Sequence, residues 1–196
     1  MDSIEYYSRN AGEYFDHTVD IDMQECWDCF TGLLPEGGSI LDLGCGSGRD
    51  SAYFISCGFD VTAMDASEEM CDLASIHIGQ DVLQLSFKEM DFNEVFNGIW
   101  ACASLLHVPG DEIDAIFTKV VKSLKINGVL FMSFYYGDFE GERDGRYYKD
   151  YRSKALKDLA ARHEDVEVIE IQRCEDTRSE SNSEWIYALV RRVEMD

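Results

Sequence analysis

Apolar residues recur along the chain with two different periods, and these periods divide it into helices and strands. Spacings of three and four residues predict helices over residues 3–16 and 21–34. From residue 39 onward, short apolar runs typical of buried strands alternate with amphipathic segments. The strands are expected at 39–43, 60–64, 82–87, 99–104 and 129–135, with helices between them at about 48–57, 67–77 and 110–124. This alternation predicts a mostly parallel sheet covered by helices.

The last quarter of the chain departs from this order. Residues 136–151 lack a clear period, which predicts an insertion loop or a short hairpin, and a helix is expected at about 152–163. Two alternating runs, 166–173 and 184–192, flank the polar stretch 175–183 and pair most simply as an antiparallel hairpin. The predicted fold is α/β. It is a doubly wound, Rossmann-like sheet of seven strands, five parallel plus a C-terminal antiparallel pair, with helices on both faces and an N-terminal helical cap.

The first predicted strand ends in the most informative chemical feature of the chain. Three glycines follow it at alternate positions, Gly44, Gly46 and Gly48, and a helix-like segment begins at once. Glycines let a backbone turn tightly and bring main-chain N–H groups close to a ligand. The strand carries an acid, Asp42. A second acid, Asp65, ends the next strand about twenty residues on, where such folds bind a ribose hydroxyl. These features predict a site for a nucleoside-containing cofactor.

The length of 196 residues fits one domain with a sizeable core. We therefore expect a single domain over 1–196. Within it, residues 1–35 form the helical cap, 36–135 the cofactor-binding core, and 136–196 the substrate-side insertion with the C-terminal helix and hairpin.

Composition narrows the choice of partners. The formal net charge of −22 repels phosphate backbones and anionic lipids, which argues against nucleic acid and membrane as partners. No apolar run approaches the roughly twenty residues of a membrane span, and the N-terminus lacks a basic-then-apolar leader. We expect a cytoplasmic protein whose seven cysteines are thiols. Cys26 and Cys29 form a CxxC without a second pair, so no metal site is predicted.

Five segments, in this order and spacing, resemble the class I S-adenosylmethionine-dependent methyltransferases. They are residues 41–48 (LDLGCGSG), 61–67 (VTAMDAS), 90–92 (MDF), 104–108 (SLLHV) and 124–130 (LKINGVL). The likeness runs from about residue 41 to 192 and is strongest to the small-molecule group that includes tellurite-resistance-type enzymes. No Asn-Pro-Pro-Tyr or Asp-Pro-Pro-Tyr follows the fourth strand, so amino-methylating DNA enzymes are not supported. The resemblance implies transfer of a methyl group from S-adenosylmethionine to a small-molecule nucleophile by in-line displacement, leaving S-adenosylhomocysteine.

The resemblance also implies roles for individual residues. The glycines would underlie the methionyl part of the cofactor, with Asp42 near its amino group. Asp65 would accept hydrogen bonds from the ribose, and Asp91 from the adenine amino group, with the Phe92 N–H on a ring nitrogen. The full implied cofactor-binding set is Asp42, Gly44, Gly46, Gly48, Arg49, Asp65, Ala66, Met70, Asp91, Phe92, Ala103 and Ser104.

Candidate catalytic and substrate-binding residues come from the segments expected to face the cofactor. His107, on the loop after the fourth strand, is either a base or positioning group at the methyl, or a histidine packed under the next helix. Tyr7, on the helix expected to fold over the cofactor, is the second catalytic candidate. The substrate-binding candidates are Tyr136, Tyr147 and Tyr148. Three arginines either bind an acidic acceptor or balance the acidic surface: Arg49, Arg143 and Arg146.

Two rival functions remain at this point. One is a non-catalytic S-adenosylmethionine-binding module or partner subunit. The other is an NAD-dependent oxidoreductase, whose fingerprint needs a glycine where the chain has Arg49. The sequence leaves open whether the acceptor atom is sulfur, oxygen, nitrogen or a metalloid, and whether the protein is a monomer or a homodimer.

Overall fold

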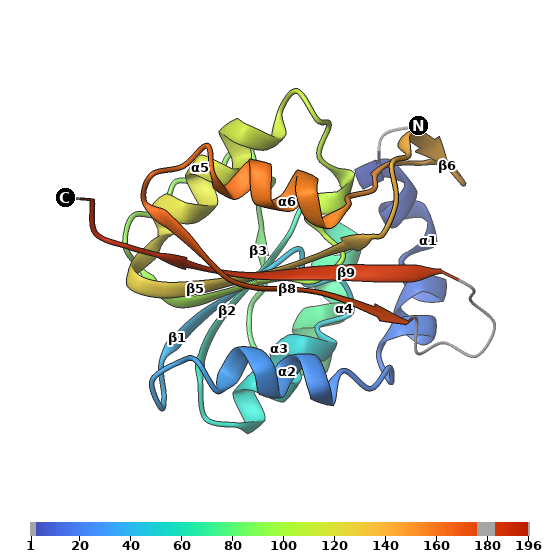
Figure 1. The fold of residues 1–196 in the computed structure, drawn as a ribbon. Helices are drawn as coiled ribbons and strands as arrows, with labels where there is room; N and C mark the ends of the chain where they lie inside the picture. The colour runs from blue at the N-terminus through green and yellow to red at the C-terminus, as the bar shows by residue number, and fades with distance from the viewer. Residues whose placement is uncertain (1–2, 176–182, 196) are drawn as a thin grey trace.

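The computed structural model describes residues 3–175 and 183–195, and Figure 1 shows how they fold. Seven strands form one sheet in the order β3-β2-β1-β4-β5-β9-β8. In chain order these strands are β1 (Ser39–Leu43), β2 (Asp60–Asp65), β3 (Leu83–Gln84), β4 (Phe96–Ala101), β5 (Leu124–Tyr135), β8 (Val166–Glu175) and β9 (Glu184–Arg192). Of the polar loop expected at 175–183, residues 176–182 lie outside the described residues.

The sheet is parallel except at its C-terminal end. β1 pairs with β2 on one side and β4 on the other, and β3 and β5 continue these pairs in the same direction. β9 runs antiparallel between β5 and β8. The predicted α/β sheet of five parallel strands with a C-terminal antiparallel pair is therefore confirmed. Because the chain winds outward from β1 in opposite directions, a crevice forms at the carboxyl ends of β1 and β4, where such sheets bind ligands.

Helices cover both faces of this sheet. Figure 1 places α5 (Ile113–Ser123) and α6 (Ser153–Ala160) on one face, and α2 (Gln24–Thr31), α3 (Arg49–Ser56) and α4 (Glu68–Ile78) on the other. Ser67 caps α4 as predicted, because its hydroxyl accepts a hydrogen bond from the Met70 N–H at 3.3 Å. Among the described residues, no helix is long and apolar enough to cross a bilayer.

The N-terminal cap is α1 (Ser3–Thr18), which packs against α4. It bends at Asn10, where φ is −116° and ψ is 16°, and the Asn10 side-chain amide donates to the Tyr6 carbonyl at 2.7 Å. A local side-chain bond of this kind competes with the regular helical ladder. The bend divides α1 into a first half that carries Tyr7 and a second half that carries Tyr14.

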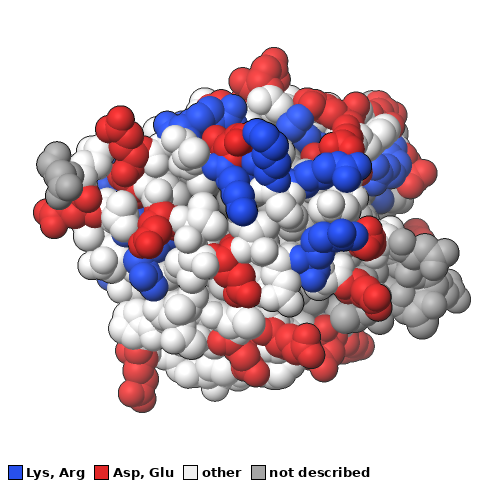
Figure 2. All heavy atoms as spheres, viewed as in Figure 1, with Lys and Arg blue, Asp and Glu red and all other residues white. Residues whose placement is uncertain are grey.

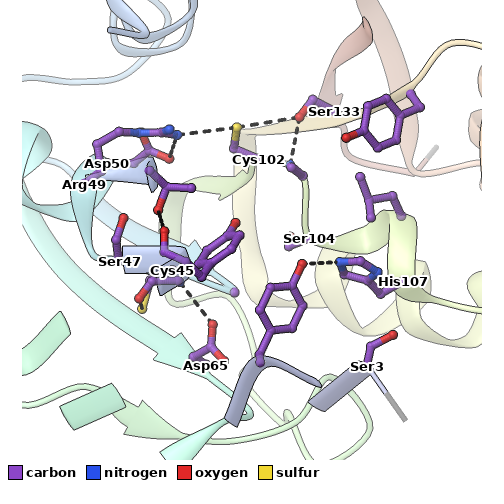
Figure 3. A pocket seen from close by; sticks show the side chains of 18 of the residues that line it. Ser3, Cys45, Ser47, Arg49, Asp50, Asp65, Cys102, Ser104, His107 and Ser133 are labelled. Carbon is purple, nitrogen blue, oxygen red and sulfur yellow. Dashed lines mark hydrogen bonds and ion pairs between the residues drawn. The ribbon is translucent and has the colours of Figure 1, made fainter. Parts of the chain in front are cut away.

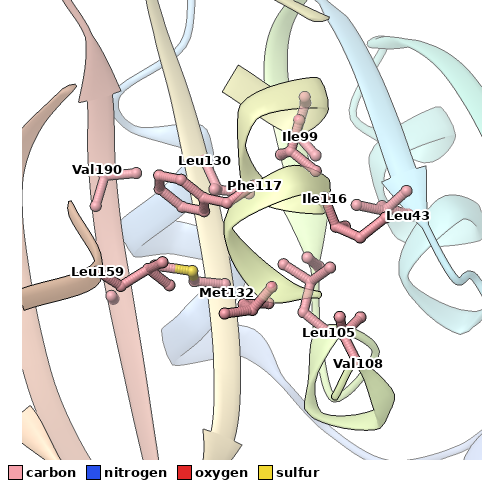
Figure 4. Close-up of a cluster of buried hydrophobic side chains, with 14 of the residues drawn as sticks. Leu43, Ile99, Leu105, Val108, Ile116, Phe117, Leu130, Met132, Leu159 and Val190 are labelled. Carbon is pink, nitrogen blue, oxygen red and sulfur yellow. The ribbon is translucent and has the colours of Figure 1, made fainter. Parts of the chain in front are cut away.

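The larger part of the core lies between the sheet and α5 (Figure 4). Ile116 and Phe117 of α5 pack onto β1, β4 and β5, where Leu43, Ile99 and Leu130 are fully buried. Replacing a buried Phe by Ala typically costs about 3–5 kcal/mol, so this packing holds the strand ends in a fixed position.

A buried carboxylate organises the opposite face. Asp50, at the start of α3, accepts hydrogen bonds from the indole N–H groups of Trp27 at 2.9 Å and Trp100 at 2.8 Å. It also pairs with Arg49 at 2.8 Å. Because the four side chains come from α2, α3 and β4, this network fixes the helix that follows the glycine loop to the sheet.

Several elements differ from the predicted bounds. β3 is only two residues long instead of spanning 82–87, because the chain turns away from the sheet after Leu85. β4 lies at 96–101 instead of 99–104, and β5 begins at Leu124 instead of 129. The insertion 136–151 contains a separate hairpin, β6 (Glu140–Arg143) with β7 (Arg146–Lys149). Its two-residue turn, Asp144-Gly145, has positive φ at both positions, as tight hairpins require.

Candidate active site

A cavity of about 1290 Å³ lies at the carboxyl ends of the parallel strands. Its wall combines the glycine loop, the end of β2, the turn after β4, one face of α1 and the β6–β7 hairpin. Pockets for one small ligand usually measure about 300–1,000 Å³. The cavity is therefore large enough for two small molecules side by side.

The glycine loop forms the floor of this cavity. Gly44 has φ of 76°, and a Cβ there would lie 2.7 Å from the Cβ of Ser104. Gly48 also has positive φ but does not line the cavity, and a Cβ there would lie 2.9 Å from the Ile78 side chain of α4. Gly44 is therefore needed where the loop meets the end of β4, whereas Gly48 is needed for helix packing.

Asp65 holds the glycine loop in place (Figure 3). Its carboxylate accepts hydrogen bonds from the N–H groups of Gly46 and Ser67, both at 3.0 Å. Burial raises the pKa of Asp65 above the ordinary aspartate range, although these N–H groups act in the opposite direction. Asp65, Ala66 and Met70 all line the cavity, as expected for the predicted ribose side of the site.

His107 and Tyr7 meet across the cavity (Figure 3). The Tyr7 hydroxyl lies 2.8 Å from His107 Nε2, and His107 Nδ1 lies 2.7 Å from the carbonyl oxygen of Tyr147. Because a carbonyl only accepts, Nδ1 carries the proton, and Nε2 accepts from the Tyr7 hydroxyl. Burial lowers the pKa of His107 to about 4, with the Arg146 cation adding to the effect. The imidazole is therefore neutral at pH 7.

A second set of hydrogen-bonded groups in the cavity wall lies at the turn after β4. Ala103 has φ of 51°, and its N–H donates to the Ser133 hydroxyl at 2.8 Å. Ser133 Oγ in turn donates to Cys102 Sγ at 3.7 Å, beside Arg49. Ser133 was not predicted, although a serine inside the apolar run of β5 is a usable signal. Ala103, Ser104 and Arg49 line the cavity as expected.

Besides Gly48, three other predicted cofactor residues do not line the cavity. Asp42 is buried beneath the glycine loop and accepts from Ser51 Oγ at 2.6 Å; burial, together with nearby Asp50, raises the pKa of Asp42. Asp91 has an 86% exposed side chain, 3.4 Å from Lys122. Phe92 packs against Phe96 with ring centroids 5.2 Å apart.

The short β3 explains where Asp91 and Phe92 lie. The chain turns after residue 85, so Ser86 and Phe87 reach the cavity and the later residues pass it by. A correct prediction would have required the strand to end three residues earlier than its apolar run.

The tyrosines divide between the cavity and the outer surface. Tyr147 and Tyr148, from the β6–β7 hairpin, line the cavity. Tyr136 does not line it, and its ring lies 3.9 Å from the Arg173 guanidinium carbon. Successive residues of an extended chain point to opposite sides, so the neighbouring Tyr135 lines the cavity instead.

The CxxC offers no sign of metal or redox chemistry. Burial raises the pKa of Cys26 to about 12, the opposite of an activated thiol. Within residues 3–175 and 183–195, no three His, Cys, Asp or Glu side chains are grouped to hold a metal ion.

Comparison with known proteins points to one family. Residues 40–128 match the family model described as a methyltransferase domain. The chain is 30% identical over 108 residues to the ubiquinone biosynthesis O-methyltransferase of Xanthomonas axonopodis pv. citri. That alignment covers 52% of this chain and 44% of the relative, so the chain matches less than half of the relative's length.

Solved structures share the fold. The 1,6-didemethyltoxoflavin-N1-methyltransferase of Burkholderia thailandensis, crystallised with 1,6-didemethyltoxoflavin and S-adenosylhomocysteine, superposes with a TM-score of 0.81. Its sequence identity is 21%, and the match covers 97% of this chain and 87% of that one. The [4+2]-cyclase SpnF superposes with a TM-score of 0.73 at 13% identity, over 99% and 97% of the two chains. The narrower likeness to tellurite-resistance-type enzymes stays a prediction. Residues 40–128 therefore match a methyltransferase domain, and the described part of the chain has the Rossmann-like fold of solved methyltransferases.

Proposed function

We propose that this protein transfers a methyl group from S-adenosylmethionine to a small molecule bound in the same cavity. The observation that carries the proposal is the cavity wall itself, which combines a glycine floor, the Asp65 carboxylate and the hydrogen-bonded Tyr7–His107 pair. The cavity volume allows a cofactor and an acceptor to bind together.

The residues present fit the cofactor. Gly44 and Gly46 line the cavity without a side chain, and the Ser104 hydroxyl is buried there with no hydrogen-bond partner among the described residues. An amino-acid tail supplies polar groups for such a floor, and ribose hydroxyls supply donors for Asp65. We assign the tail to Gly44, Gly46 and Ser104 and the ribose to Asp65. Phe87 and Met70 form the apolar wall for the base in place of Asp91 and Phe92.

The bound cofactor supplies a sulfonium methyl. A bond from the acceptor atom to the methyl carbon forms as the carbon–sulfur bond breaks, giving methylated acceptor, S-adenosylhomocysteine and one proton. The protein's contribution is mainly placement of the acceptor in line and exclusion of water. α1 and the β6–β7 hairpin close the cavity over the reacting region, because Ser3 Oγ accepts from the Tyr147 N–H at 3.1 Å.

Tyr7 and His107 provide a route for the acceptor's proton. The Tyr7 hydroxyl donates to His107 Nε2, so its oxygen has a lone pair for an acceptor X–H group. The acceptor's proton would pass to the Tyr7 oxygen as the Tyr7 proton passes to Nε2. General-base assistance of this kind typically contributes about 10²–10⁴-fold in rate.

Titration calorimetry with S-adenosylhomocysteine tests the cofactor assignment. Asp65→Asn keeps the size of the side chain and removes its charge, and we expect the Kd to rise by at least about tenfold, since hydrogen bonds to charged groups contribute about 1.5–3 kcal/mol. Asp60→Asn, at the exposed start of the same strand, is the matched control and should bind like the wild type.

Two results would contradict the proposal. Equal binding of NAD and S-adenosylhomocysteine by the wild type would remove the cofactor assignment. Tight binding of S-adenosylhomocysteine without transfer of labelled methyl to any member of a panel of thiols, phenols, amines and carboxylates would favour the binding-module alternative.

A further inference from the structure

Three basic side chains other than histidine line the cavity, and only one of them lacks a carboxylate partner. Arg49 pairs with Asp50 at 2.8 Å, and Lys88 pairs with Glu112 at 2.8 Å. Arg146, from β7, makes no ion pair with any described residue. The cavity therefore contains one guanidinium whose charge the protein leaves uncompensated.

The surroundings of Arg146 hold it in place without neutralising it. Its guanidinium carbon lies 4.4 Å from the ring centroid of Tyr6, 5.6 Å from that of Tyr7 and 5.2 Å from that of Tyr148. Its only hydrogen bond to a described residue runs from Nη1 to the Tyr7 hydroxyl at 3.3 Å. Arg146 Nε is buried and has no hydrogen-bond partner in the described part of the chain. Aromatic faces attract a guanidinium but leave its N–H groups available.

Most described arginines of this acidic chain pair with a carboxylate. The net charge is −22, and seven other arginines pair with carboxylates: Arg9, Arg49, Arg143, Arg152, Arg162, Arg173 and Arg192. Leaving a partly buried donor unpaired costs free energy that a bound acceptor recovers. The forked N–H groups of arginine match the two oxygens of a carboxylate or phosphate.

We propose that the acceptor carries a carboxylate or phosphate and that Arg146 binds this group, with the Tyr148 hydroxyl as a second donor. This inference rests on the proposed methyl transfer. The Tyr148 hydroxyl has no hydrogen-bond partner among the described residues, and its ring packs on His107 at 4.9 Å between centroids.

The position of Arg146 also indicates where the nucleophilic atom of the acceptor lies relative to its anionic group. Arg146 donates to Tyr7, and Tyr7 donates to His107. An anion on Arg146 therefore lies next to the proposed proton route, so the nucleophile is a near neighbour of the anionic group. Asp20, Asp22 and Glu25 also line the cavity, and their carboxylates repel an anion. Among the three candidate arginines, Arg49 is paired and Arg143 does not line the cavity, which leaves Arg146.

Ligand binding to the protein saturated with S-adenosylhomocysteine tests this anion subsite. The probes are benzoate and phenyl phosphate, with benzamide as the neutral counterpart, at constant ionic strength. We expect at least one anion to bind about tenfold or more tightly than benzamide. The tighter of the two identifies carboxylate or phosphate as the recognised group.

Variants distinguish loss of anion binding at this subsite from a general loss of folded structure. Arg146→Gln should lose the preference for the anion over benzamide, and Arg146→Lys should keep part of this preference. Arg143→Gln, on the same hairpin, should bind the probes like the wild type. Tyr148→Phe, which keeps the packed ring, should weaken anion binding and leave the S-adenosylhomocysteine affinity unchanged.

The outcomes distinguish the two proposals. Failure of the wild type to bind S-adenosylhomocysteine overturns the proposed function. If the wild type binds S-adenosylhomocysteine normally, three results would overturn the anion subsite alone. They are that neither anion binds, that benzamide binds as tightly as the anions, or that neither Arg146→Gln nor Tyr148→Phe weakens anion binding.

Discussion

Burial sets the charge state of the residues around the proposed reacting centre. The His107 ring packs against Tyr7 and Tyr148, and burial is the main cause that lowers the pKa of His107 to about 4. A neutral ring keeps its lone pair on Nε2 and leaves Tyr7 as the group that meets the acceptor. So weak a base accepts a proton only from an acceptor that becomes strongly acidic as the methyl group arrives.

The protonation of His107 can be measured directly by NMR titration of its ring nitrogens. We predict an Nδ1–H tautomer at neutral pH and a transition near pH 4. Tyr7→Phe should shift the Nε2 signal at neutral pH, because it removes the donor on that atom. Since the folded pKa lies below the unfolded value of about 6.5, His107 destabilises the fold progressively as pH falls from about 6.5 to about 4. A ring that titrates near 6.5 in the folded protein would contradict this assignment.

At the scale of single residues, sequence reasoning proposed Gly44, Gly46, Asp65, His107 and Tyr7, which all line the cavity. These positions follow from local chemistry at strand ends, which a sequence displays. Arg146 could be named only as one of three arginines, because ion pairing depends on residues distant in the chain. The sequence offered no way to see that Asp50 neutralises Arg49 while Arg146 remains unpaired.

At the scale of elements, periodicity located the helices and strands, but their ends depended on tertiary contacts. Hydrophobicity predicted a long third strand, yet its last residues turn into the cavity wall. The Asp144-Gly145 pair carried a hairpin signal, which would have favoured β6 and β7 over an irregular loop. That hairpin brings Arg146 to the site.

The cap α1 has few buried contacts with the body of the protein. Ala11 is its only buried residue, and its ties to the body include the Ser8–Ser67 hydroxyl contact at 3.1 Å and the Tyr7–His107 hydrogen bond. A weakly buried helix opens locally at low free-energy cost.

We therefore predict that S-adenosylhomocysteine slows amide hydrogen exchange in α1, because a bound molecule beneath the helix adds contacts. The amides of α6, which is anchored by buried Leu156 and Leu159 and does not line the cavity, serve as the control and should change little. Equal changes in both helices would indicate general stabilisation, and no change in α1 would show that it is not the cover of the site.

At the scale of the whole molecule, a strongly acidic chain contains a cavity in which Arg146 makes no ion pair with a described residue. Figure 2 shows acidic side chains spread over one face, with basic ones gathered in its upper half, on the side of α6. The net charge of −22 opposes binding of anions at large, so selection of an anionic acceptor would depend on Arg146.

The most direct test of the central proposal is a crystal structure grown with saturating S-adenosylhomocysteine. We predict ligand density in the cavity, with the amino-acid tail on Gly44 and Gly46, the ribose on Asp65, and the sulfur facing the Tyr7–His107 pair. Density at another place, or a cavity without ligand, would contradict the proposed function.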